Sequence, residues 1–192
     1  MTKDAFKDRE RGLEEEFFRK EDVKRLEKMR ETAKLQEIAG ALAEVLKVKN
    51  PELLSRAISL GIDRDTAAGF LLAPLVQVAW AEGKVTEPER EAILRFARSR
   101  GVEKGSPAEA QLLAWLQARP AQAVFDTAIE VIKAGLAEFP PNEREDRIAK
   151  MIQACREVSE ASGGLAKALG GSGTSSEERS VLDVVTKALR SE

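Results

Sequence analysis

Apolar residues crowd the middle of this chain, whereas polar residues interrupt them almost everywhere else. Seven of them fall close together: Leu71, Leu72, Leu75, Val76, Val78, Ala79 and Trp80. The run is long and contains good helix formers, so it predicts a helix that is buried on most sides. A central strand is the alternative, but the alanines argue mildly against it. Pro74 should either kink this helix or restart it.

A tight acidic turn and a second helix are predicted next. Gly83 is placed to end the first helix, because glycine readily adopts the left-handed conformation. Thr86 is a good N-cap, Glu89 completes a capping box, and Pro88 falls in the first turn. Apolar residues then recur at helical spacing before Gly101: Ala92, Ile93, Phe96 and Ala97.

Capping residues predict further helices on both sides of this hairpin. Asn50 followed by Pro51 opens a short helix, and Ser106 with Glu109 forms another capping box. Pro120 opens a longer helix. The sequence therefore predicts an all-α chain.

Residues 157–182 echo the central hairpin. A helix bearing Ala and Val ends in a glycine turn, and Ser175 and Glu178 then parallel Thr86 and Glu89. The second copy has Ser162-Gly163 at its turn and about ten additional residues after it. Its glycine-rich segment, residues 170–174, lacks the Lys-Ser/Thr pair of a phosphate-binding loop, so a flexible linker is expected there.

The segment VAWAEGKVTEPEREAIL, residues 78–94, resembles the signature of TerB-like domains, a helical family first named from tellurite resistance. That signature is a small-residue helix, an Asp-Gly turn, a Ser or Thr, and a Glu that opens the next helix; Glu82 stands where the family usually has Asp. The resemblance covers roughly residues 53–192. It implies a TerB-like helical bundle with two acidic helix–turn–helix repeats related by a pseudo-twofold axis.

Residues 1–34 are dense in both charge signs and favour helix. Two narrow apolar stripes run along this predicted extended helix, first Phe6, Leu13 and Phe17, then Leu26, Met29 and Ala33. Such stripes are typical of a helix that docks on a partner or pairs with itself. The charge density drops and the apolar phase shifts near Lys34. We therefore predict a charged docking helix over residues 1–34 and a TerB-like domain over residues 35–192.

The N-terminal helix also resembles the start of the zeta subunit, a small inhibitor of alphaproteobacterial F-type ATPases. The resemblance rests on Phe6, Asp8, Arg9, Glu10, Leu13, Glu14, Phe17 and Glu21. That family inserts its N-terminal helix into the catalytic head and blocks rotation. An extended surface helix or a dimerising helix is the alternative. The residues expected to bind a partner are Phe6, Arg9, Glu10, Leu13, Glu14, Phe17 and Phe18.

Composition narrows the function classes. The 192 residues include no His and no Tyr, and the lack of His excludes Ser-His-Asp and Cys-His catalysis and His-containing zinc sites within this chain. Acid–base catalysis would fall to Glu, Asp or Lys, and no nucleophile–base pair stands out among them, so we expect no enzyme. A net charge of −2 supplies no general attraction for nucleic acid. No apolar run approaches 18 residues, so a cytoplasmic protein without membrane insertion is expected. The single Cys155 lies among apolar positions and is interpreted as a buried structural thiol rather than a reactive one.

Three carboxylates of the acidic turns are candidate metal ligands: Glu82, Glu89 and Glu178. Oxygen ligands would suit Ca²⁺ or Mg²⁺. The sequence nevertheless favours the other role for these side chains, capping of the helix N-termini, where the macrodipole stabilises a carboxylate.

The sequence thus favours a non-enzymatic TerB-like protein-interaction module, stress-related or regulatory, that presents an N-terminal docking helix for a protein partner or for self-association. Two alternatives stay open. One is a divalent-metal-responsive sensor that uses the acidic turns. The other is an inhibitor of a rotary ATPase that acts through the N-terminal helix.

Overall fold

The computed structural model describes residues 3–161 and 175–191, with side chains from Arg19 onward. All regular structure in these ranges is helical and no strand occurs there, which confirms the predicted all-α class. The helices are α1 (Lys3–Leu46), α2 (Pro51–Ser59), α3 (Ala67–Phe70), α4 (Ala73–Ala79), α5 (Glu87–Ser99), α6 (Pro107–Gln117), α7 (Gln122–Ala137), α8 (Pro141–Ala161) and α10 (Ser176–Arg190).

The chain divides into two compact units, Met1–Ile38 and Ala39–Glu192. The first unit is the larger part of α1. The second contains the last turns of α1 and all the other helices. The boundary predicted near Lys34 falls just before this division, and α1 continues through Lys34 without interruption.

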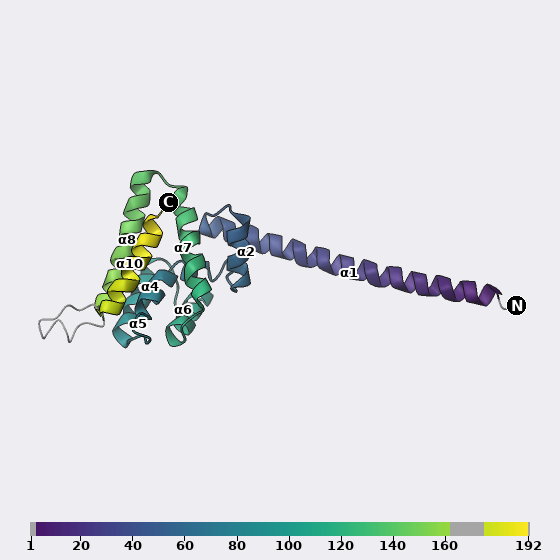
Figure 1. Ribbon diagram of the computed structural model, residues 1–192, viewed down its shortest axis with the longest axis horizontal. Helices are drawn as coiled ribbons and strands as arrows, with labels where there is room; N and C mark the ends of the chain where they lie inside the picture. Colours follow the sequence, from purple (N-terminus) through teal and green to yellow (C-terminus); the bar gives the residue numbers. More distant parts are fainter. Residues whose placement is uncertain (1–2, 162–174, 192) are drawn as a thin grey trace, which may run out of the picture. The chain divides into compact units, whose positions relative to one another are not determined.

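Helix α4 lies at the centre of the second unit and packs against α5, α6, α7, α8 and α10 (Figure 1). All of its residues except Gln77 are buried, as expected for the central apolar run. Pro74 lies in the first turn of α4, so the proline restarts the helix rather than kinking it. The short helix α3 precedes this restart.

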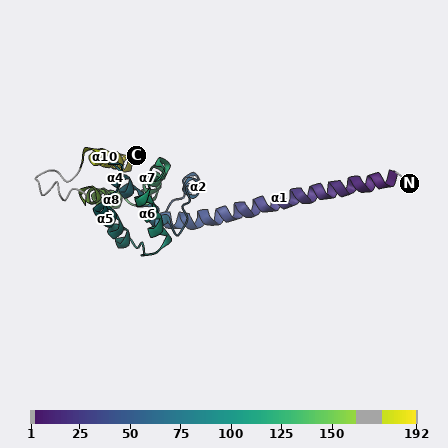
Figure 2. The same ribbon diagram turned by 90° about the horizontal axis from the view of Figure 1, so that it is seen from below.

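Helices α8 and α10 lie side by side in both views and cover α4 together (Figures 1 and 2). Helix α5 packs along α8, while α6 contacts α3 and α7 contacts α2. The largest fully buried side chains include Phe70, Phe125, Leu75 and Ile93. One continuous apolar core therefore supports every helix of the second unit.

Two glycines allow close backbone contacts in this core. A Cβ atom on Gly69 of α3 would lie 2.8 Å from the carbonyl oxygen of Ala108. A Cβ atom on Gly135 of α7 would lie 2.8 Å from the carbonyl oxygen of Leu46. Any larger residue at either position would push two backbone segments apart.

Candidate functional site

Two buried glutamates, Glu89 and Glu178, meet at the N-termini of α5 and α10. Each is the third residue of its helix and closes a capping box. The Glu89 carboxylate accepts hydrogen bonds from the backbone N–H and the hydroxyl of Thr86, both at 2.7 Å. The Glu178 carboxylate accepts one from the backbone N–H of Ser175 at 2.7 Å. The two glutamates are only 3% and 1% exposed, and their carboxyl groups hydrogen-bond to each other.

The surroundings of Glu89 change how tightly this carboxyl group binds its proton. Burial raises the pKa of Glu89, and the charge of Glu178 and the hydrogen bond to it raise this pKa further. The two donors of Thr86 act in the opposite direction. Because a buried carboxyl group beside a second carboxyl group ionises less readily, Glu89 holds its proton more tightly than an isolated glutamate does.

The predicted metal ligands are only partly brought together. Glu89 and Glu178 are in contact, whereas Glu82 is exposed in the turn before α5. Among the residues that the structure describes, no group of three or more Cys, Asp or Glu side chains is placed to hold a metal ion. Besides their contact with each other, Glu89 and Glu178 make the hydrogen bonds of helix capping, and the Ca²⁺ or Mg²⁺ site stays a prediction.

A third buried carboxylate, Glu109, has the same position in α6. It accepts a hydrogen bond from the backbone N–H of Gly105 at 2.6 Å, and its own backbone N–H donates to the Ser106 hydroxyl at 3.2 Å. The guanidinium group of Arg98 lies 3.6 Å from its other oxygen. Glu109 therefore has a cation as its partner, whereas Glu89 has a second carboxyl group.

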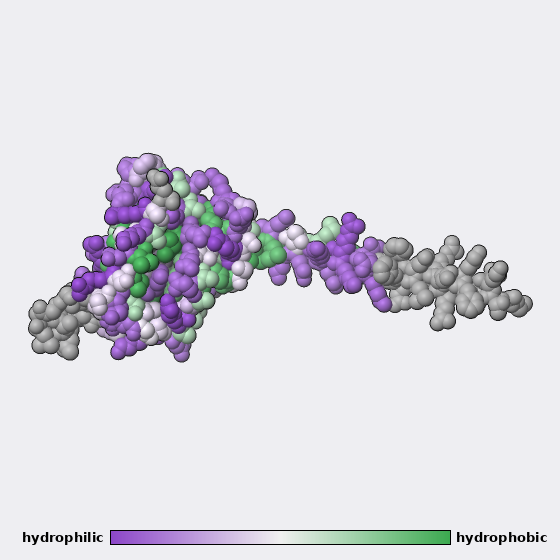
Figure 3. All heavy atoms as spheres, viewed as in Figure 1, coloured by the Kyte–Doolittle hydropathy of each residue, from purple (hydrophilic) through white to green (hydrophobic). Residues whose placement is uncertain are grey.

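The described part of α1 in the first unit has no buried side chain over residues 19–37 and is mostly hydrophilic (Figure 3). Leu26 and Met29 are nevertheless large, apolar and exposed, at 53% and 61%. Arg25 and Lys28 line the same shallow hollow as Met29. The partner-binding residues predicted from the sequence belong to the preceding turns of α1, and their side chains lie outside the described residues: Phe6, Arg9, Glu10, Leu13, Glu14, Phe17 and Phe18.

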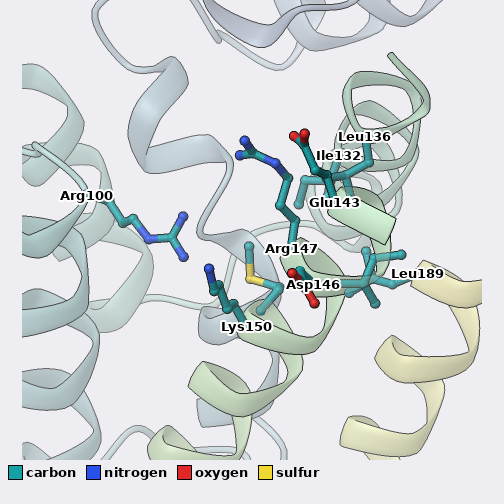
Figure 4. A pocket seen from close by; sticks show the side chains of 10 residues that line it. Arg100, Ile132, Leu136, Glu143, Asp146, Arg147, Lys150 and Leu189 are labelled. Atoms are coloured by element: carbon teal, nitrogen blue, oxygen red, sulfur yellow. The ribbon is translucent and has the colours of Figure 1, made fainter. Parts of the chain in front are cut away.

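A pocket of about 370 Å³ opens in the second unit where the end of α5 faces α8 (Figure 4). Arg100, at the C-terminal end of α5, and Lys150 of α8 direct their charged groups into it, and Arg147 lies on its wall. Glu143 and Asp146 also line the pocket. Sequence reasoning did not find this cluster, because Arg100 is far from α8 in the chain and no motif links them.

Apolar side chains form the remaining wall of this pocket and continue into a second one of about 290 Å³. The two pockets share Arg100, Ile132, Leu136 and Met151. The second pocket extends along Leu71, Val131 and Phe139. A cationic mouth is thus joined directly to an apolar groove.

Comparisons with protein-family models, with curated proteins and with solved structures found no match to this chain. Within the residues described here, none of the helices combines the length and apolar character needed to cross a membrane.

Proposed function

We propose that this chain is a non-enzymatic TerB-like protein-interaction module, stress-related or regulatory, whose N-terminal helix docks on an acidic amphipathic segment of a partner protein. The exposure of Leu26 and Met29 on α1 is the observation that carries this proposal. Burying each of these side chains against a partner would contribute about 1.5–3 kcal/mol.

The charge around these two residues favours an acidic occupant. Residues 19–34 carry seven Lys or Arg and four Asp or Glu, although the whole chain has a net charge of −2. Among the described residues, no carboxylate forms an ion pair with Arg25 or Lys28, the two cations beside Met29. An amphipathic helix with Asp or Glu beside its apolar face would pair with both cations.

The meeting of Glu89 and Glu178 supports the TerB-like part of the proposal. The resemblance led us to expect two acidic turns related by a pseudo-twofold axis, and the two glutamates come from the corresponding positions of these turns. Their contact is what such a relation would produce.

Photo-crosslinking from position 29 tests the docking surface. A photoreactive amino acid replaces Met29 in the full chain, and crosslinked partner segments are sequenced by mass spectrometry. The matched control carries the same group at Val184 of α10, which is comparably exposed at 56%. We expect position 29, but not position 184, to crosslink an amphipathic segment rich in Asp and Glu. Because salt screens the ion pairs, the crosslinking yield should fall in 0.5 M salt.

Three outcomes would contradict the proposal: crosslinks from position 29 only to a second copy of the chain, equal crosslinking from both positions, or none. Sedimentation velocity of the unmodified chain identifies self-association independently. The sequence-derived substitution of Phe17 and Phe18 by Ala should reduce crosslinking while leaving the melting temperature of the second unit nearly unchanged. A drop of many degrees would instead make that part of α1 integral to the fold.

A further inference from the structure

The joined pockets of the second unit have the chemical character of a small-molecule site. Each has a volume near the lower end of the range for ligand pockets, and the two share one wall. One end is cationic, and the other is lined mainly by apolar side chains, together with Lys47. We propose that this site binds an amphiphilic anion, a single hydrocarbon chain with one carboxylate or phosphate head group.

The head group would lie between α5 and α8. Arg100 contributes from one side, and Arg147 and Lys150 contribute from the other (Figure 4). Among the described residues, none of the three cations is within ion-pair distance of a carboxylate. Two of them lie over aromatic rings instead: Arg100 is 4.9 Å from the centroid of Phe96, and Arg147 is 3.9 Å from that of Phe139.

The charge balance of the pocket limits the ligand to a small charge. Glu143 and Asp146 line the same mouth as the three cations, so the lining side chains leave an excess of one positive charge. A carboxylate would neutralise this excess, and a phosphate monoester would exceed it by at most about one charge at pH 7. A polyphosphate would bring several negative charges close to the two carboxylates, where like charges repel.

The hydrocarbon chain would follow the shared wall into the apolar groove. Ile132 and Leu136 of α7 and Met151 of α8 line both pockets, so the chain would leave the head group without crossing a polar region. Phe139 continues the groove, and the guanidinium group of Arg147 stacks on its ring. Methionine is unbranched and adapts to a flexible chain, and the ring of Phe139 adds a large apolar surface.

Isothermal titration calorimetry with the full chain tests this proposal. Sodium decanoate and decyl phosphate, each below its micelle concentration, are the amphiphilic anions; decanol lacks the charge, and acetate lacks the chain. We expect saturable one-to-one binding of at least one of the two anions, binding of decanol about tenfold weaker, and no detectable binding of acetate. Comparison of decanoate with decyl phosphate identifies the preferred head group.

Two pairs of charge-removing substitutions distinguish binding at this site from nonspecific electrostatic attraction of the anion to the protein surface. Arg147→Gln with Lys150→Gln should weaken binding of the preferred anion about tenfold and weaken decanol binding much less, because decanol has no charge to pair with either side chain. Arg64→Gln with Lys104→Gln removes two exposed charges outside both pockets and should change neither. All four side chains are exposed, so these proteins should fold.

A second variant tests the groove. Ala68→Leu narrows the apolar pocket and should weaken binding of both the anion and decanol, provided that its melting temperature without ligand matches that of the natural sequence. The proposal is overturned if neither anion binds, if uptake does not saturate, if decanol binds as tightly as the anions, or if the two pairs of substitutions have equal effects.

Discussion

Replacing Glu89 by glutamine should remove most of the pH dependence of stability that the buried carboxyl pair produces. The pKa of Glu89 is raised in the folded chain above its ordinary value of 4.5, first by burial and then by Glu178. The folded state therefore binds this proton more tightly than the unfolded state does. The resulting stabilisation is fully present below pH 4.5 and is lost as the pH rises through the raised pKa.

The size of the effect follows from proton linkage. A difference of one bound proton changes the free energy of unfolding by at most about 1.4 kcal/mol per pH unit. Glutamine resembles the protonated glutamate, because its oxygen still accepts from the N–H and hydroxyl of Thr86 and its amide still donates to Glu178. We therefore expect Glu89→Gln to match the natural sequence at pH 4.5 and to be the more stable protein at pH 8.

Two other variants show which property of Glu89 matters. Glu89→Ala leaves both donors of Thr86 without an acceptor and should cost about 1–3 kcal/mol at every pH. Glu87→Gln changes a glutamate in the same helical turn whose side chain is 73% exposed. This control should keep the pH dependence of the natural sequence.

The assay is urea unfolding followed by tryptophan fluorescence at half-unit steps between pH 4.5 and 8. The natural sequence should lose more stability over this range than Glu89→Gln does. Equal pH slopes for these two proteins would refute the reasoning, because Glu89 would then bind its proton no more tightly in the folded state than in the unfolded state. A destabilised Glu89→Gln at pH 8 would likewise show that the charged form is the one the fold needs.

Three further predictions concern single residues. Trp80 is partly buried, and its Nε1–H donates to a main-chain carbonyl oxygen at 2.8 Å. In urea melts followed by circular dichroism, Trp80→Ala should therefore lower the free energy of unfolding by about 3 kcal/mol and Trp80→Phe by about 1 kcal/mol. A loss below about 0.5 kcal/mol for the alanine variant, the size of a neutral surface change, would show that the ring contributes no packing. Gly69→Ala should lower the melting temperature by many degrees, because the added Cβ would clash with the Ala108 carbonyl oxygen. Gly40→Ala has open space around the added Cβ in α1 and should raise the free energy of unfolding by up to about 1 kcal/mol. If both substitutions changed stability in the same direction, the packing argument would be contradicted. Burial raises the pKa of Cys155 to about 12, so its thiol should stay unreactive toward a disulfide reagent at pH 8 and react at once in denaturant; rapid labelling of the folded chain would contradict its burial.

Local sequence was enough to predict several helix ends, although the helix expected to open at Pro120 begins at Gln122. Thr86 and Glu89 form their capping box across three residues, and Asn50 accepts hydrogen bonds from the first backbone N–H groups of α2. Gly83 and Gly101 have φ angles of 78° and 84°, the left-handed region that made them the expected stops. These features depend only on neighbouring residues, so they can be predicted without the fold. The central apolar run is favourable only when it is removed from water, so its place in the core could also be predicted from the sequence.

Only the tertiary structure shows which residues far apart in the chain contact each other. Periodicity shows which side of a helix is apolar, but it does not show which other helix covers that side. The pocket of Arg100, Arg147 and Lys150 forms because α5 and α8 pack together, and no spacing in the sequence relates the end of one helix to the start of the other. The same is true of Gly69, whose need for glycine arises from the backbone of α6.

The pair of Glu89 and Glu178 depends both on local sequence and on tertiary packing. The sequence by itself placed Glu89 and Glu178 at capping positions of two helices, because each capping contact lies within three residues. Only the packing of α4, α5, α8 and α10 decided that these two caps are buried against each other. Burial and contact raise the pKa of Glu89, and both are properties of the assembled core rather than of any local segment.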